Sequence, residues 1–278
     1  MTWYSLLLTN PELLTKKVIG RLRRRVVKVP RAPIIKLING TIRYEFLWQQ
    51  FLCDEDIRAI LTDTYDLILC DYLKSVLSAG DTVIDVGANV GYISAVASSY
   101  VGTSGAVHGF EPLRPCFERL QVLSGLNPQF HLVFNNVALG DQEGILPITY
   151  DPDGESRNAT LVPGKKASLT VPVPVKRLDK YILSTISSPE RIKLIKIDVE
   201  GYEFPVLRGL EAFFAESRCR PLIVCEVKPW EIEALGYTMS DFEQYMRGFG
   251  YRSYDIAQRH KPVSLSQLTD MEVVLFRV

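Results

Sequence analysis

A short apolar stretch bounded by two glycines constrains the fold of this chain more than any other part. Residues 83–86 have the sequence V-I-D-V, which is typical of a strand buried on both faces of a sheet. Gly87 and Gly91 follow and bracket a tight turn, and residues 92–101 continue with helix-compatible spacing. A strand that turns at glycine into a helix presents backbone amides at the edge of a sheet, where α/β folds bind nucleotide-like ligands. The sequence therefore predicts a ligand-binding turn at residues 87–91.

The rest of the chain alternates between strand-like and helix-like patterns. Strands are expected at residues 82–86, 106–111, 130–137, 192–198, 222–227, 251–256 and 272–278. Helices are expected at residues 54–79, 92–101, 112–126, 177–183, 203–215 and 240–248. This alternation predicts an α/β fold with a mostly parallel, seven-stranded sheet, helices on both faces and an antiparallel last strand. Residues 140–175 are rich in turn residues and predict an inserted hairpin with a loop.

Residues 1–63 are expected to form an N-terminal extension before a domain at residues 64–278. Apolar residues recur at helical spacing within residues 13–36, and basic residues with no acid among them lie between. Such a basic amphipathic helix could contact an anionic membrane surface. The alternative, which we favour, is a helix that packs on the domain or on a second copy of the chain. Residues 41–52 alternate and predict a short strand or hairpin.

Composition excludes several classes of protein. Lys and Arg total 32, as do Asp and Glu, and this balance argues against a dedicated nucleic-acid binder. No apolar run is long enough for a secretory signal or a membrane span. The five cysteines include no C-x-x-C pair, so reduced thiols in a cytoplasmic protein are expected.

Acidic residues at strand ends are the first candidates for a binding site. Glu111 closes a predicted strand about 20 residues beyond the glycine turn, where an acid can accept hydrogen bonds from ribose hydroxyls. The dinucleotide fingerprint G-x-G-x-x-G is missing, because residues 88–90 separate the two glycines. A dehydrogenase is therefore a weaker alternative.

A second acidic group follows the strands at residues 192–198 and 222–227. Asp198, Glu200 and Glu226 should converge at the carboxyl edge of the sheet, beside the glycine turn. Carboxylates this close can act as a general base or hold a divalent cation. The alternative is that Glu200 and Glu203 lie at a solvated helix start, where acids are common.

Other side chains are weaker candidates. His108 and His131 lie within predicted strands and are expected to be structural. His260 lies in the loop before the last strand, and Trp230 follows Glu226. Trp230 could form an aromatic wall for a sugar, although a core or capping role is an equal alternative.

The chain resembles the FkbM family of S-adenosylmethionine-dependent methyltransferases. The matching stretches are D-T-V-I-D-V-G-A-N-V-G-Y (81–92), G-F-E-P (109–112), N-V-A-L-G-D (136–141), V-K-R-L-D (175–179), I-K-L-I-K-I-D-V-E-G-Y-E (192–203) and C-E-V (225–227). The resemblance implies a class I, Rossmann-like methyltransferase fold and O-methylation of a small molecule or sugar.

The resemblance also implies roles for individual residues. The methionine part of S-adenosylmethionine would be surrounded by Asp85, Gly87, Ala88, Asn89 and Gly91. Glu111 would hold the ribose, and the residues near the adenine would be Asn136, Val137 and Ala138. Asp198 would also bind the cofactor, and Asp198 and Glu200 would lie at the methyl-transfer end of the site.

The function expected from these observations is methyl transfer to a hydroxyl of a small molecule, sugar or glycan. The acceptor hydroxyl must lose a proton, and Asp198, Glu200 and Glu226 are the candidate catalytic residues, with a divalent cation as an optional helper. A nucleic-acid methyltransferase and a non-catalytic cofactor-binding protein are the alternatives. A homodimer is compatible with the sequence.

Overall fold

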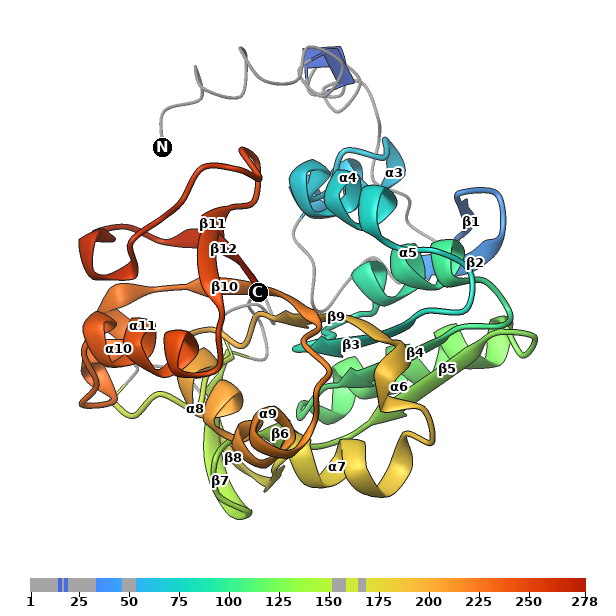
Figure 1. The fold of residues 1–278 in the computed structure, drawn as a ribbon. Helices are drawn as coiled ribbons and strands as arrows, with labels where there is room; N and C mark the ends of the chain where they lie inside the picture. Colours follow the sequence, from blue (N-terminus) through green and yellow to red (C-terminus); the bar gives the residue numbers. More distant parts are fainter. Residues whose placement is uncertain (1–14, 17, 20–33, 47–53, 152–158, 165–168) are drawn as a thin grey trace.

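A seven-stranded sheet forms the centre of the molecule (Figure 1). The computed structural model describes residues 15–16, 18–19, 34–46, 54–151, 159–164 and 169–278. The strands lie in the order β11–β12–β10–β9–β3–β4–β5. Their bounds are β3 (Thr82–Val86), β4 (Ala106–Phe110), β5 (His131–Asn135), β9 (Ile192–Ile197), β10 (Leu222–Val227), β11 (Arg252–Asp255) and β12 (Glu272–Arg277). Only β12 runs against the common direction of this sheet, so the predicted mostly parallel sheet is confirmed.

The strand order reverses beside β3. The chain proceeds from β3 through β4 to β5 on one side, and then returns to place β9 and β10 on the other side. β3 and β9 are therefore hydrogen-bonded neighbours, with Val86 opposite Ile197 at their carboxyl ends. Ligands bind at such a switch point in open α/β sheets, because the loops that follow the two strands diverge there.

Apolar side chains on both faces of the strands bury this sheet. Side chains alternate along a strand, so Ile84 and Ile195 join one hydrophobic cluster while Val83 and Leu194 join the other. The first cluster includes residues of α7 (Leu178–Thr185), α8 (Glu203–Arg208), α9 (Glu211–Glu216), α10 (Pro229–Ala234) and α11 (Met239–Gly248). The second includes residues of α3 (Asp54–Leu61), α4 (Leu67–Val76), α5 (Tyr92–Val101) and α6 (Arg114–Leu126). Helices thus cover both faces, as predicted.

The predicted insertion is a small separate sheet, below the central sheet in Figure 1. Its hairpin pairs β7 (Gly144–Tyr150) antiparallel with β8 (Leu169–Lys176), and β6 (Ala138–Leu139) pairs parallel with β8. A third cluster forms between this sheet and the start of α6, and it includes Ile148, Val173 and Cys116. The remaining short elements are the 3-10 turns η2 (Pro189–Arg191) and η3 (Leu265–Gln267).

The N-terminal part contributes a hairpin to the same core. β1 (Ile34–Ile38) pairs antiparallel with β2 (Ile42–Phe46), and Ile38, Ile42 and Tyr44 are buried in the cluster of α3–α6. Most of the expected basic helix at residues 13–36 lies outside the described residues, and residues 34–36 belong to β1 instead. The division of the chain at residue 63 stays a prediction. No helix in the described part has the length and hydropathy of a membrane span, and no disulfide joins the cysteines described.

Two predicted helices are interrupted, and one helix was not predicted. The helix expected at residues 54–79 ends at Leu61 and restarts at Leu67, after Asp66 with φ 39°. The helix expected at residues 203–215 is divided into α8 and α9 at Gly209, where a Cβ would lie 2.3 Å from the Gly140 carbonyl oxygen. α10 directly follows β10, in a stretch for which the sequence patterns predict no element.

Candidate active site

Two strand ends meet so closely at the switch point that residue 87 must be glycine. Gly87 has φ 76°, and a Cβ on it would lie 1.8 Å from the carbonyl oxygen of Asp198. The Asp198 amide donates a hydrogen bond to the Val86 carbonyl at 3.1 Å. A side chain at residue 87 would therefore push the two ends apart, and the expected proximity of the glycine turn to Asp198 is confirmed.

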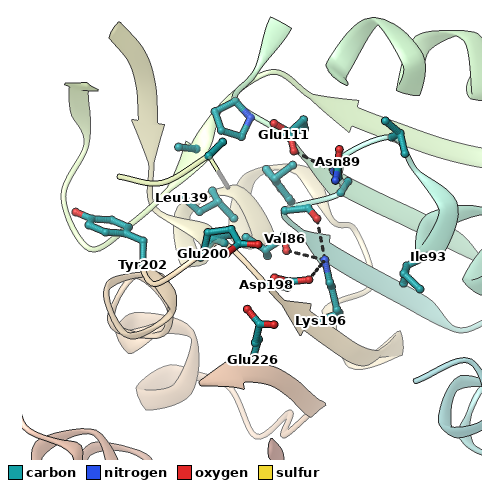
Figure 2. A pocket seen from close by; sticks show the side chains of 18 of the residues that line it. Val86, Asn89, Ile93, Glu111, Leu139, Lys196, Asp198, Glu200, Tyr202 and Glu226 are labelled. Carbon is teal, nitrogen blue, oxygen red and sulfur yellow. Dashed lines mark hydrogen bonds and ion pairs between the residues drawn. The ribbon is translucent and has the colours of Figure 1, made fainter. Parts of the chain in front are cut away.

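A pocket of about 280 Å³ opens at these strand ends (Figure 2). The predicted site residues that line it are Gly87, Ala88, Asn89, Glu111, Val137, Ala138, Asp198, Glu200 and Glu226. The structure adds further lining residues from the central sheet, its loops, α5 and β6: Val86, Val90, Tyr92, Ile93, Phe110, Pro112, Leu139, Lys196, Val199 and Tyr202. It adds a further wall made by Ile60, Tyr65, Asp66, Ile148, Ala159 and Leu161.

Asp85 does not line the pocket, which corrects the expectation that it surrounds the cofactor. Its strand neighbour Val86 and its cross-strand partner Lys196 line the pocket instead. The carboxylate accepts a hydrogen bond from Ser94 Oγ at 2.6 Å and forms an ion pair with Lys196 at 3.2 Å. Asp85 is 1% exposed, and these two contacts connect the end of β3 to α5 and β9.

Gly91 and Asn136 also lie behind the pocket and not in its wall. A Cβ on Gly91 would lie 2.7 Å from Leu120 Cδ2, so this glycine lets α5 start close to α6. Asn136 Nδ2 donates to the carbonyl oxygens of Glu111 and Pro112, each at 2.9 Å. The Asn136 side chain thereby fixes the backbone of the residues that follow β4.

Lys196 connects the glycine turn to β9. Its Nζ donates to the Gly87 carbonyl at 2.7 Å and forms ion pairs with Asp85 at 3.2 Å and Asp198 at 3.6 Å. Burial would lower the pKa of Lys196, but the charges of Asp85 and Asp198 outweigh it and hold that pKa above its usual value. The ammonium therefore stays charged under the pocket floor.

Glu111 is held at the edge of the pocket by backbone amides (Figure 2). Its two carboxylate oxygens accept hydrogen bonds from Asn89 N at 2.9 Å and Leu113 N at 2.8 Å. Burial raises the pKa of Glu111 to about 7. Each carboxylate oxygen can accept a further hydrogen bond, so a hydroxyl in the pocket can still be bound.

Asp198, Glu200 and Glu226 converge on one wall, as Figure 2 shows. Each residue offers one carboxylate oxygen, and these three oxygens lie within 4.8 Å of one another. Burial and the Asp198 charge raise the pKa of Glu226 to about 8. Lys228, directly after β10, forms ion pairs with Glu200 and, at 2.7 Å, with Glu226. Carboxylate oxygens are the donors that Mg²⁺ and Ca²⁺ prefer, but a divalent ion would have to compete with the Lys228 ammonium for two of the three carboxylates.

The loop that carries Glu200 is organised by a buried acid. Glu203 is 0% exposed, and its Oε1 accepts hydrogen bonds from the amides of Val199 and Gly201, each at 3.0 Å. Burial raises the pKa of Glu203 to about 7. The alternative that Glu200 and Glu203 lie at a solvated helix start is therefore wrong for Glu203. Glu200 has φ 58°, a strained conformation that the loop contacts maintain.

The α3–α4 connection contributes to the pocket, although no motif in the sequence assigns it to the site. Tyr65 and Asp66 line the pocket from this connection. The Asp66 side chain accepts a hydrogen bond from Leu69 N at 3.3 Å and so caps α4. The polar run T-D-T-Y-D at residues 62–66 is the sequence signal that indicates this interruption.

The remaining aromatic and histidine candidates lie outside the pocket. His108 is buried against the Tyr181 hydroxyl at 2.9 Å, and burial lowers its pKa to about 4. This environment is that of a structural residue, as predicted. His131 and His260 are exposed and do not line the pocket. Trp230 is also outside it, 47% exposed, with its Nε1 donating to Glu231 at 3.0 Å.

Known proteins with similar sequences are methyltransferases. Methyltransferase sdnD from Sordaria araneosa is 28% identical over 177 residues, which cover 53% of this chain and 68% of that protein. Methyltransferase 1 from Beauveria bassiana is 27% identical over 147 residues, which cover 46% of this chain and 58% of that protein.

Solved structures that match this chain are more distant in sequence. A TehB-like S-adenosylmethionine-dependent methyltransferase from Corynebacterium glutamicum is 12% identical with a TM-score of 0.41, and the match covers 79% of this chain and 92% of that chain. Aeropyrum pernix fibrillarin, solved with bound S-adenosylmethionine, is 12% identical with a TM-score of 0.41, covering 73% of this chain and 68% of that chain.

Family-wide sequence profiles give the assignment. The profile of protein-L-isoaspartate(D-aspartate) O-methyltransferases matches residues 28–122 only. The profile of the methyltransferase FkbM domain matches residues 85–253, which include the glycine turn, Glu111 and the acids that follow β9 and β10. Because this match covers more than half of the chain, the protein belongs to the FkbM family and is an S-adenosylmethionine-dependent methyltransferase.

Proposed function

We propose that the protein transfers a methyl group from S-adenosylmethionine, bound in the pocket of Figure 2, to a hydroxyl of a small molecule, sugar or glycan. The observation that carries this proposal is the position of the acid wall. The Asp198 carbonyl lies against the glycine turn. Glu200 and Glu226 each have a carboxylate oxygen within 4.8 Å of a carboxylate oxygen of Asp198. An acceptor against these carboxylates would be next to the cofactor.

The pocket offers a suitable surface for each part of the cofactor. Residues 87–89 present the backbone of the turn, which fits the methionine part. Glu111, fixed by two amides, accepts the ribose hydroxyls. Val137, Ala138 and the neighbouring Leu139 provide an apolar surface for the adenine.

The protein's own chemical task is to position the acceptor and take its proton. S-adenosylmethionine supplies a methyl group already activated by the sulfonium. The acceptor oxygen forms a bond to the methyl carbon while the carbon–sulfur bond breaks, and the hydroxyl proton passes to a carboxylate. Asp198 is the best placed base, because its side chain lies in the pocket wall, is 43% exposed and has Lys196 at 3.6 Å on one oxygen. The products are S-adenosylhomocysteine and the methyl ether, and Asp198 releases the proton to solvent.

The charge of the pocket favours an acceptor without phosphates. Among the described residues, those that line it and carry charge are the acids Asp66, Glu111, Asp198, Glu200 and Glu226 and the base Lys196. Lys228 pairs with Glu200 and Glu226 from outside the lining, and the acids still outnumber the two lysines. Negative potential attracts the cationic sulfonium, whereas it repels a phosphate backbone. Carboxylates also accept hydrogen bonds from hydroxyls, so a neutral, hydroxyl-rich acceptor suits this wall better than a nucleic acid.

Labelling identifies the acceptor directly. The full chain is incubated with S-adenosylmethionine carrying an isotopically labelled methyl group and an extract of the source organism, and labelled products are identified by mass spectrometry. We expect the label on a hydroxyl oxygen of a small molecule or glycan. Label in RNA or DNA would contradict the proposal. Absence of S-adenosylhomocysteine binding in calorimetry would contradict the cofactor site itself.

Contacts made by the N-terminal segment stay predictions. Residues 13–36 could contact an anionic membrane surface or a second copy of the chain. Co-sedimentation with anionic vesicles, with and without residues 1–33, tests the first. Equal sedimentation of the proteins with and without residues 1–33 would contradict the membrane contact.

A further inference from the structure

Three carboxylates in a 4.8 Å group require a compensating cation, and a lysine already supplies one. Lys228 follows the last residue of β10, and its side chain is 12% exposed. Its Nζ contacts Glu226 at 2.7 Å and also contacts Glu200, so the ammonium binds two of the three acids that could otherwise ligate a metal.

We propose that the Lys228 ammonium is a permanent internal cation of the acceptor site, where it takes the place of a divalent metal ion and positions Glu200 and Glu226. Methyl transfer by this enzyme then needs no divalent metal. This inference rests on the proposed function, because it assumes that the acid wall faces the acceptor.

Two lysines balance the carboxylates near the strand ends. Lys196 on β9 forms ion pairs with Asp85 and Asp198. Lys228 after β10 pairs with Glu200 and Glu226. Every one of these acids therefore has an ammonium partner, and a divalent ion is not needed to neutralise the wall.

The backbone around Lys228 is fixed by α10. The amides of Glu231 and Ile232 donate to the Lys228 carbonyl at 3.0 and 3.3 Å, which places Lys228 at the start of this helix. A Cβ on Gly201 would lie 2.6 Å from Glu231 Cβ, so α10 packs directly on the loop that carries Glu200. The lysine and its acid partner are thus held together by a backbone contact that does not depend on their charges.

The protonation of Lys228 agrees with a permanent charge. Burial alone would lower its pKa, but Glu226 and Glu200 outweigh burial and hold the pKa of Lys228 above its usual value. The lysine is therefore a poor proton acceptor, and its role is to position the acids and balance their charge. Removing it would take the ammonium away from two partly buried carboxylates, and oxygen ligands that have lost this counter-charge can bind a divalent cation from solution.

Binding of Mn²⁺ to the full chain tests the proposal without any acceptor. The proteins compared by calorimetry and by the electron paramagnetic resonance of free Mn²⁺ are the wild type, Lys228→Met, Lys228→Arg, Lys228→Met with Glu226→Gln, and Lys180→Met as control. Lys180 pairs with Glu143 at the surface, so its loss removes a lysine without exposing the acid wall. Circular dichroism confirms that each protein is folded.

We expect one Mn²⁺ to bind Lys228→Met at least about tenfold more tightly than the wild type, because three hard oxygen ligands become available. Lys228→Arg and Lys180→Met should bind Mn²⁺ like the wild type. Adding Glu226→Gln to Lys228→Met should remove the gained binding, since one ligand is lost.

Tight stoichiometric Mn²⁺ binding by the wild type would overturn the proposal, and so would a folded Lys228→Met protein that gains no binding. Lys228→Gln, which keeps a polar side chain of similar length, replaces Lys228→Met should the latter not fold. Calorimetry with S-adenosylhomocysteine on the same samples tests the cofactor site separately. A failure of the proposed function is thereby distinguished from a failure of this inference.

Discussion

Gly87 touches Asp198 through backbone atoms alone: the glycine turn after β3 lies against the carbonyl of the acid that follows β9. Gly87 has φ 76°, and a Cβ on this residue would lie 1.8 Å from the Asp198 carbonyl oxygen, so no other residue fits here. The switch point of the sheet is therefore fixed by main chain, and the side chains of the pocket are arranged around it.

Gly87→Ala should separate the two strand ends. We expect a loss of about 3 kcal/mol or more in the free energy of unfolding, from strain at positive φ and displaced backbone, together with weakened S-adenosylhomocysteine binding. Urea denaturation and calorimetry measure the two effects. Gly125→Ala in α6 is the matched control, because a Cβ there meets nothing within 4 Å. Equal stability of the two variants would contradict the contact.

Asp198→Asn should abolish methyl transfer while the cofactor still binds. We expect turnover to fall at least about 100-fold, because the amide cannot take the acceptor proton. The shape of the pocket is kept, so S-adenosylhomocysteine affinity should change little in calorimetry. Glu118→Gln, on the exposed surface of α6, serves as the control. Near-normal turnover of Asp198→Asn would remove Asp198 as the base.

Asp66→Asn should weaken binding of the cationic cofactor without destabilising the protein. Asn can keep both the positive φ and the cap of α4, so only the charge that faces the pocket is lost. Asp66→Ala additionally loses the cap, and we expect it to cost about 1 kcal/mol of stability. Calorimetry with S-adenosylmethionine and thermal unfolding separate the two effects. Unchanged affinity in Asp66→Asn would show that this acid does not face the cofactor.

Buried acids should make the protein less stable as the pH rises. Burial raises the pKa of Glu203 from 4.5 to about 7, so the folded state binds this proton more tightly than the unfolded state does. The resulting stability is fully present below pH 4.5, and it is lost as the pH rises through about 7.

Glu203→Gln should flatten that pH dependence. The amide oxygen can accept the same two backbone hydrogen bonds, but it carries no charge to bury. For the wild type we expect the titration of Glu203 alone to lower the free energy of unfolding by up to about 3 kcal/mol between pH 5 and pH 8. Urea denaturation across this pH range measures the slope, with Glu118→Gln as control. An equal slope in wild type and Glu203→Gln would contradict the assignment.

The central sheet could be predicted because its signals are local and repeated. Residues 82–86 and 222–227 are mostly apolar, with one acid in each strand near its carboxyl end, and the two faces of the sheet need such apolar side chains. The glycine turn and Glu111 were found by their spacing. Asp198 was found because the carboxyl ends of neighbouring parallel strands meet at the same edge.

Residues that act through contacts distant in sequence could not be found in this way. Lys196 lies within the strand pattern I-K-I-D, where a lysine between apolar residues usually indicates a solvated position. Lys228 precedes a helix of six residues, too short for periodicity to show. Asp85 and Asn136 were assigned to the pocket wall, but the direction of their side chains depends on Ser94 and on the carbonyls after β4.

The inserted sheet has its own small hydrophobic cluster, separate from the two that bury the central sheet. Its strand β7 nevertheless supplies Ile148 to the pocket wall, Ala159 and Leu161 beside it do the same, and the pairing of β6 with β8 joins it to the lining residues Ala138 and Leu139. Substitutions in this hairpin can therefore reshape one side of the cavity while the main cores stay intact. Among diverging relatives, or in directed evolution, this is the part of the architecture where selectivity for new substrates can be acquired at the lowest risk of unfolding.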